Sequence, residues 1–196
     1  MMDDRRTWVA DLAKSYGRSV FAAAYRILGN PPDAEDISQE VFLKLLERGN
    51  RYADAETIRD MGPYLRVMAS HGAIDLLRRR ASWKQVNVEG TEEIIASADP
   101  DPLAVAGQKQ KAELLRRALS SLSERDAKIF ALRYFEEFSY EEIATRLKIG
   151  VNQVGVILHR ARSRLLEILR PILEPELHPL ENPQHRAVVK KENSHV

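Results

Sequence analysis

The chain has 196 residues, which suits one or two small domains, and its net charge is only +1. Its composition, 44% hydrophobic and 30% charged, is typical of a globular protein and excludes an intrinsically disordered chain. Cysteine is absent, which excludes disulfides and thiolate metal sites. The sequence has no apolar run near the roughly 20 residues of a membrane span, and its N-terminal segment lacks the apolar core of a signal peptide. We therefore expect a cytoplasmic protein without membrane insertion.

The N-terminal part of the sequence predicts three helices. Apolar residues recur at helical spacing from Trp8 to Ala24, and the Gly-Asn-Pro-Pro sequence of residues 29–32 then ends the pattern. A second helix is predicted from Asp33 to Arg48. A polar loop, residues 49–62, leads to Pro63, which suits the first turn of a third helix reaching about Arg80.

The C-terminal part predicts four more helices, beginning at residues 109–121. Ser123 is expected to cap a helix over residues 124–138, and Ser139 with Glu142 fits a capping box for a short helix that follows. Gly150 is expected to form the turn before a longer basic helix, which contains the sequence VGVILHRARSRL of residues 154–165.

These elements predict an all-α protein of two small helical domains, residues 1–85 and 109–173. Residues 86–108 are acidic, contain Pro100 and Pro102 and show little amphipathic pattern, so they predict a flexible linker between the domains. Residues 174–196 are rich in proline and polar residues and predict a flexible tail.

Charge is divided unevenly along the chain. Residues 33–47 hold five carboxylates and one lysine, whereas residues 66–84 hold five lysines and arginines and one aspartate. Residues 160–170 hold four arginines and one glutamate. A single run of this kind is usually a solvated helix face, but segregated acidic and basic surfaces favour more than one partner.

The short capped helix, the turn and the basic helix together have the pattern of a helix-turn-helix motif, although helical hairpins of other kinds are common. In that motif the second helix enters the major groove of DNA. One face of the basic helix is predicted to pack inward: Val154, Leu158, Ala161, Leu165 and Leu169. The opposite face is predicted to point outward: Asn152, Gly155, Val156, His159, Arg160 and Ser163.

Three segments resemble the extracytoplasmic-function (ECF) sigma factors of bacterial RNA polymerase. Residues 121–165 resemble their region 4, which recognises the −35 promoter element. The segment DAEDISQEVFLKLLE (residues 33–47) resembles the part of region 2 that binds the clamp of core polymerase. The segment PYLRVMASHGAIDLLRRR (residues 63–80) resembles the part that opens and reads the −10 element. The resemblance covers roughly residues 10–85 and 110–170, in the order of the family.

The resemblance implies three sets of site residues. The expected polymerase-binding residues are Asp36, Gln39, Glu40 and Phe42. The expected −10 residues are Tyr64, His71, Asp75, Arg78, Arg79 and Arg80. The expected −35 residues are Asn152, Gln153, Gly155, Val156, His159, Arg160 and Arg162. Two alternatives to these roles remain open. Phe42 would also suit the core, and His71 would also suit a partly buried packing position.

Four of these residues depart from the family's usual pattern. Tyr64 and His71 stand where the family usually has Trp and often Asn, and a histidine can still stack on a base and donate a hydrogen bond. Gly155 and Val156 stand where Lys or Arg and then Ser are frequent. We therefore expect −35 recognition through DNA shape and phosphate contacts.

The implied function is that of an alternative sigma factor, with core polymerase (clamp and flap), promoter DNA and an anti-sigma protein as partners. The linker acids could imitate nucleic-acid charge near the polymerase active site: Glu89, Glu92, Glu93, Asp99 and Asp101. We expect a monomer without catalytic activity, cofactor or metal, because the sequence has no Gly-rich phosphate loop, zinc-binding His-Glu-x-x-His or cysteine nucleophile. His178, His185 and His195 are too widely spaced to indicate a metal site.

Two other functions remain possible on the sequence alone. One is a sigma mimic that sequesters an anti-sigma factor or polymerase without initiating transcription, which the Gly155 and Val156 departures leave open. The other is a free-standing helix-turn-helix regulator, which would bind a palindrome as a dimer. The sequence has no evident dimerisation helix to support the second.

Overall fold

A computed structural model describes residues 2–47, 60–86 and 102–177. Within these ranges the protein consists of helices and short turns, which confirms the all-α prediction. The helices are α1 (Met2–Leu28), α2 (Pro31–Glu47), α3 (Met61–Val86), α4 (Pro102–Ser120), α5 (Glu124–Tyr134), α6 (Tyr140–Leu147) and α7 (Val151–Leu177). In the described part of the chain, no helix combines the length and the apolar character that a membrane span requires.

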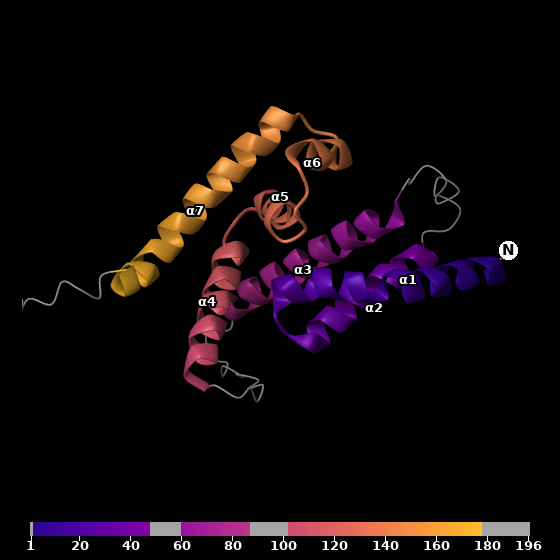
Figure 1. Cartoon of the computed structure of the whole chain (residues 1–196), viewed down its shortest axis with the longest axis horizontal. Coiled ribbons are helices and arrows are strands. Elements are labelled where there is room, and N and C mark those ends of the chain that lie inside the picture. The colour runs from indigo at the N-terminus through magenta and orange to yellow at the C-terminus, as the bar shows by residue number, and fades with distance from the viewer. Residues whose placement is uncertain (1, 48–59, 87–101, 178–196) are drawn as a thin grey trace, which may run out of the picture.

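Helices α1, α2 and α3 pack together as the N-terminal bundle (Figure 1). Small side chains of α1, such as Ala23 and Ala24, are fully buried and allow the neighbouring helices to approach closely. Larger side chains from each helix fill the interior, among them Ile27, Leu45 and Leu65. Burying each of these stabilises the bundle by about 1.5–3 kcal/mol relative to leaving it exposed.

The corner between α1 and α2 depends on Gly29. Its φ of 73° lies in the left-handed region, and its N–H closes α1 by donating to the Tyr25 carbonyl at 2.8 Å. Asn30 then caps α2, because its side-chain oxygen accepts from the Asp33 N–H at 2.9 Å. A side chain at position 29 would also overlap the guanidinium of Arg116, which reaches this corner from α4.

Helices α5, α6 and α7 form the C-terminal bundle, and α4 packs against α7. Ser123 caps α5 by accepting from the Asp126 N–H at 3.2 Å. The predicted capping box of α6 is confirmed: the Glu142 N–H donates to Ser139 Oγ at 3.1 Å, and the Ser139 N–H donates to the Glu142 carboxylate at 2.8 Å. Residues 148–150 form the turn between α6 and α7, as expected around Gly150, and Lys148 adopts the left-handed conformation there, with φ of 53°.

Three helices are longer than the sequence patterns predicted. Helix α3 continues past Arg80 to Val86, α4 begins at Pro102 rather than near residue 109, and α7 continues through Pro171 to Leu177. Pro102 occupies the first helical position, where the missing N–H costs no intrahelical bond. The expected linker, residues 86–108, therefore overlaps a helix at both ends. Its acids and the tail histidines lie outside the described residues, as does most of the expected loop before Pro63.

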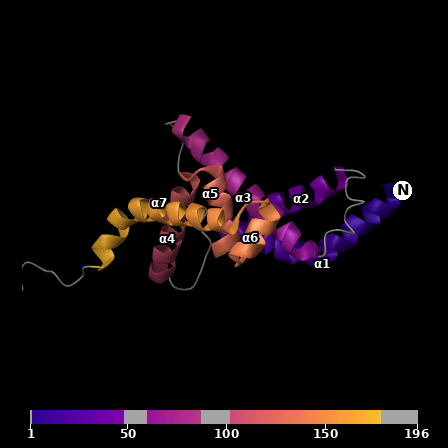
Figure 2. The same cartoon turned by 90° about the horizontal axis from the view of Figure 1, so that it is seen from above.

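The two bundles pack against each other. Helix α5 contacts both α3 and α7, and α4 also contacts α3. Figure 1 shows α5 between α3 and the α6–α7 pair, and the view from above again shows α3 and α5 side by side (Figure 2). The buried apolar side chains of both bundles form one cluster, from Val9 to Leu165.

Candidate functional site

The basic helix α7 divides into the two faces that the sequence predicted. Val154, Leu158, Ala161 and Leu165 are buried, and Leu169 is half-buried against the same core. Ile157 is also buried, although the sequence analysis did not include it. These contacts fix α7 on α5 and α6 with its opposite face toward solvent.

The solvent-facing side of α7 carries the predicted −35 residues. Six of them are exposed: Asn152, Gln153, Val156, His159, Arg160 and Arg162. The apolar side chain of Val156 is 65% exposed and therefore makes no contribution to the core. A Cβ on Gly155 would meet one ring carbon of Tyr140 at 3.7 Å, an ordinary contact. Packing therefore does not require a glycine at this position.

Arg160 is exposed but held in one orientation by Asp126. Its Nε and one terminal nitrogen donate to the two carboxylate oxygens at 3.0 Å and 2.5 Å. This paired geometry is the strongest form of the arginine–carboxylate contact, and its hydrogen bonds raise the pKa of Arg160. Because Asp126 lies in the first turn of α5, the contact ties the middle of α7 to the start of α5.

The acidic face of α2 carries the predicted polymerase-binding residues. Asp36 and Gln39 are exposed, and Glu40 forms an ion pair with Lys44 at 2.6 Å. Phe42 is half-buried and packs against the core, whereas Leu43 is 54% exposed. Leu43 follows Gln39 by four residues and Asp36 by seven, so helical spacing places all three on one face. That spacing could have identified Leu43 from the sequence.

The predicted −10 residues lie along α3 in different surroundings. Tyr64 is half-buried against the core, and Arg79 is exposed. Arg80 pairs with the buried carboxylate of Asp33 through both terminal nitrogens. Arg78 donates to the backbone carbonyls of Ser120, at 3.2 Å, and Leu122, at the end of α4.

The side chain of His71, on α3, faces the C-terminal bundle. It lines a hollow together with Glu124, Arg125, Lys128, Ile129, Leu147 and Ile149. Its Nε2 is buried and has no hydrogen-bonding partner among the described residues. Burial lowers the pKa of His71 to about 4, with a further lowering by the charge of Lys128, while Asp75 and Glu124 act in the opposite direction.

Lys128 of α5 links α3 to the C-terminal bundle. Its Nζ lies 2.8 Å from a carboxylate oxygen of Asp75 and 2.6 Å from one of Glu124. Burial would lower the pKa of Lys128, but the hydrogen bonds to the two carboxylates outweigh it and raise that pKa. In the described ranges, no three His, Asp or Glu side chains are grouped to hold a metal ion.

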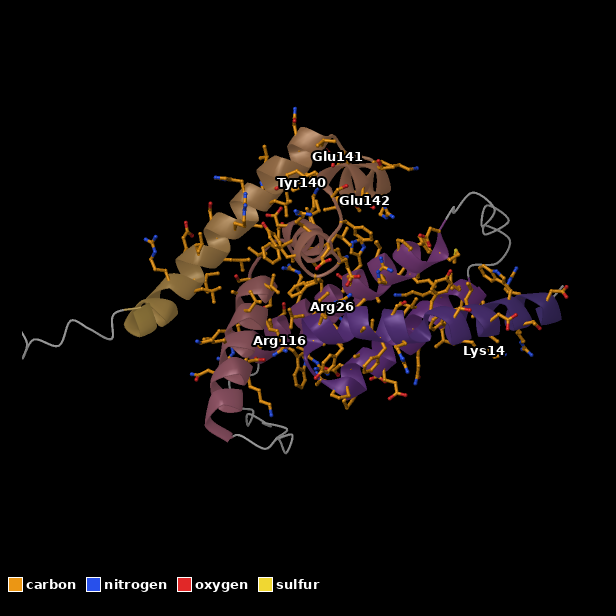
Figure 3. All side chains as sticks on the ribbon, viewed as in Figure 1. Lys14, Arg26, Arg116, Tyr140, Glu141 and Glu142 are labelled. Carbon is orange, nitrogen blue, oxygen red and sulfur yellow. The ribbon has the colours of Figure 1, made fainter. Side chains whose placement is uncertain are left out.

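A second set of polar contacts joins α1 and α3 to the chain after α5. The Glu136 side chain is 1% exposed, and its two oxygens accept from Arg26 at 2.7 Å and from Arg66 at 3.1 Å. On α4, Arg116 Nε donates to the Ile27 carbonyl at 3.1 Å. Figure 3 shows Arg26 and Arg116 where the two bundles meet. The sequence analysis assigned a pairing to none of these four residues, because their partners are too distant along the chain to form a pattern.

Comparison with known proteins finds two family matches. Residues 12–82 match the family model described as sigma-70 region 2, and residues 112–165 match the model described as sigma-70, region 4. The first match contains most of the N-terminal bundle, and the second runs from α4 into α7. Together they cover well over half of the chain.

Curated proteins of similar sequence are also found. RNA polymerase sigma factor YlaC of Bacillus subtilis is 28% identical over 87% of this chain and 97% of its own length. ECF RNA polymerase sigma factor SigW of the same organism is 27% identical over 83% of this chain and 89% of its length. Ferric citrate uptake sigma factor FecI of Escherichia coli is 28% identical over 84% of this chain and 95% of its length.

Proposed function

Since this chain belongs to the ECF sigma factors of the sigma-70 family and directs transcription initiation as an alternative sigma factor, we propose how its two bundles divide promoter recognition. The C-terminal bundle binds the −35 element through α7 and contacts the polymerase flap. The N-terminal bundle binds the polymerase clamp through α2 and reads the −10 element through α3. The observation that carries this proposal is the clean division of α7 into a buried apolar face and an exposed polar face.

The exposed face of α7 supports insertion into the major groove at the −35 element. Asn152 and Gln153 lie at the N-terminal end of the helix, the end that reaches base edges in a helix-turn-helix motif. Val156 offers an apolar contact for a thymine methyl, and Gly155 allows close approach of the DNA backbone. Arg160, oriented by Asp126, supplies a fixed positive charge for a phosphate.

The arginines of α3 support contact with promoter phosphates near the −10 element. Arg79 is exposed, and Arg78 and Arg80 lie beside it on the same helix. Phosphate contacts of this kind add affinity that depends on salt but not on sequence. His71, with Tyr64 two turns earlier on the same face of α3, would then contact an unstacked base of the melted strand.

The acidic face of α2 supports docking on a basic surface of the polymerase clamp. Asp36 and Glu40 supply the negative charge that steers association. Leu43 supplies an exposed apolar contact beside them. We assign Leu43 rather than Phe42 to this contact, because Phe42 packs against the core.

The partners and the place of action follow from this role. The protein acts in the cytoplasm with core polymerase, and as a monomer before it binds. An anti-sigma protein that covers the polymerase-binding faces is the regulatory partner that this class of sigma factor implies.

The test is transcription by bacterial core polymerase from fragmented genomic DNA, with and without the protein, followed by sequencing of the 5′ ends. We expect new start sites that share paired upstream elements. The variant Asn152→Ala/His159→Ala should use these starts at least tenfold less, since each lost base contact costs about 1–3 kcal/mol. Ser163→Ala, an exposed change further along α7, is the matched control. Tight binding to core polymerase without new start sites would contradict the proposal.

A further inference from the structure

The C-terminal end of α3 carries a tryptophan that the fold leaves at the surface. Trp83 is 72% exposed, the largest exposed fraction among the bulky apolar side chains of the described residues. Figure 2 shows this end of α3 extending beyond the other helices. The match to sigma-70 region 2 ends one residue earlier, at residue 82. Packing in the described part of the chain therefore gives Trp83 little to do, and it lies just outside the matched region.

Two arginines lie beside the indole on the same side of α3. Arg79 precedes Trp83 by four residues and Arg80 precedes it by three, and these spacings bring helical side chains together. At about 100° per residue, Arg79 points about 40° to one side of Trp83 and Arg80 about 60° to the other. Arg79 is exposed, and the Arg80 side chain is 54% exposed. Together these three residues form the α3 end patch.

Arg80 is held in one orientation by α2. Both terminal nitrogens of its guanidinium donate to the carboxylate of Asp33, whose side chain is only 10% exposed. Asn30 donates to the same carboxylate at 2.5 Å. All three residues belong to the N-terminal bundle, so this arrangement does not depend on how the two bundles pack. The guanidinium is therefore oriented before a partner binds, which lowers the entropy cost of a contact with it.

The chemistry of the α3 end patch fits the backbone of DNA. Arginines bind phosphate oxygens, and tryptophan offers an apolar ring to a deoxyribose and an indole N–H to a phosphate. Asp33 neutralises the charge of Arg80, so Arg79 supplies the net positive charge of the patch. The one acidic residue of α3, Asp75, lies two turns before Arg79 and Arg80 and does not oppose an anion there.

The place of the patch on α3 indicates which part of the DNA it meets. At 1.5 Å per residue, Trp83 lies about 18 Å beyond His71 along the helix axis, and this is roughly five base pairs at 3.4 Å each. The chain leaves α3 at this end to reach the bundle that binds the −35 element, which lies upstream. The patch is therefore placed toward the duplex between the two elements, the spacer, rather than toward the melted strand.

We propose that the α3 end patch binds the sugar–phosphate backbone of the spacer next to the −10 element, with Trp83 on a deoxyribose and Arg79 and Arg80 on phosphates. The inference rests on the proposed function, because it takes α3 as the helix that reads the −10 element. Such a contact carries no sequence information, but it fixes the register of α3 on the duplex. It adds affinity for every promoter whose spacer is intact.

The contact is tested with two DNA fragments that differ only in the spacer. Both come from a promoter identified by start-site mapping, carry a pre-melted −10 region and lack the −35 element, and only the longer fragment keeps the spacer duplex. In complex with core polymerase, Trp83→Ala should bind the longer fragment at least about fivefold more weakly than the unaltered protein does, the loss typical of a truncated interface contact. It should bind the shorter fragment equally well.

The matched control is Tyr25→Ala, which removes an exposed aromatic ring from α1 of the same bundle. This variant should bind both fragments normally. Because Trp83 is exposed, Trp83→Ala should keep the urea midpoint of the unaltered protein, so that weaker binding reports a lost contact rather than a lost fold.

Arg79→Ala separates the contribution of charge from that of the ring. This variant should also weaken binding to the longer fragment, and it should reduce the slope of log K against log salt concentration by about one, because one phosphate contact is lost. Trp83→Ala should leave this slope unchanged, since indole is uncharged. An unchanged slope after Arg79→Ala would overturn the phosphate contact.

Three other outcomes would overturn the inference. Normal binding of the longer fragment by Trp83→Ala would show that the DNA does not touch the ring. Equal losses on both fragments would place the contact at the −10 element. Weaker binding of Trp83→Ala to core polymerase without DNA would assign the patch to a protein partner. A lack of promoter-specific starts with the unaltered protein is a different result, because it would overturn the proposed function and this inference with it.

Discussion

The packing around Gly155 leaves room for a larger side chain. Gly155 lies inside α7, where glycine is less stable than alanine by about 0.5–1 kcal/mol, and a Cβ would fit beside Tyr140. Glycine at this position on the exposed face therefore lowers the stability of α7 without a packing reason. Close approach of DNA to the backbone is the use that the proposed function assigns to it.

The variant Gly155→Ala is expected to raise the free energy of unfolding by about 0.5–1 kcal/mol and to reduce transcription from −35-dependent promoters severalfold. Urea denaturation and start-site counts measure the two effects. Ser163→Ala, also exposed on α7, should leave transcription unchanged. Equal transcription by Gly155→Ala and the unaltered protein would show that DNA does not approach this position closely.

His71 makes the stability of the fold sensitive to pH. Its pKa is about 4 in the folded protein, against an ordinary value of 6.5, so the fold favours the neutral ring. The unfolded chain takes up a proton below pH 6.5, and the folded protein does so only near pH 4. Acidification across this interval therefore favours unfolding.

We expect the free energy of unfolding to fall by up to about 3 kcal/mol as the pH drops from 6.5 to 4 through His71 alone. Asp75, Glu124, Arg125 and Lys128 surround the ring, and the hydrogen bond from Lys128 lowers the pKa of Glu124. Urea denaturation of His71→Gln therefore isolates the histidine contribution, because the variant should lose that part of the pH dependence. The same slope in both proteins would contradict the assignment.

At the scale of elements, α2 shows how one position along a helix changes a residue's role. Phe42 and Leu43 are adjacent, but successive side chains of a helix point about 100° apart, so one packs against the core and the other faces solvent. The exposed member shares its face with Asp36 and Gln39.

Leu43→Lys is expected to weaken binding to core polymerase at least tenfold, because it places a charge at the apolar contact, while changing stability by less than about 0.5 kcal/mol. Titration of labelled polymerase measures the affinity. Asp11→Asn changes the net charge by the same amount at an exposed position of α1 and should bind normally. Weakened binding after Phe42→Leu, with Leu43→Lys unaffected, would reverse the assignment.

Local patterns predicted most of the elements but not all of their ends. The capping box of α6 and the apolar face of α7 both depend on residues three or four positions apart. Both can therefore be recognised directly in the sequence. Pro102 suggested an interruption, yet it begins a helix, and Pro171 lies inside α7. A proline restricts φ and removes a donor, and neither effect alone decides whether a helix starts, ends or continues.

At the scale of the whole molecule, the packing of the two bundles could not be predicted. Glu136 meets Arg26 and Arg66 across 110 and 70 residues, and no periodicity relates positions so far apart. The sequence suggested two domains joined by a linker, and it singled out His71, Asp75 and Arg78 without indicating that α5 and the turn before it contact them. The candidate residues were thus predictable one by one, whereas their shared surroundings were not.

The continuous apolar cluster has a consequence for how the molecule melts. Because buried side chains of both bundles belong to one cluster, heat should unfold the free protein in a single cooperative transition, with equal calorimetric and van't Hoff enthalpies. Glu136→Gln should separate this into two transitions, while Glu137→Gln should not. Two transitions in the unaltered protein would mean that the bundles melt independently. A single transition would mean that each bundle depends on the other for its stability. A destabilising substitution in the core of α7 would then also lower the temperature at which α1 unfolds.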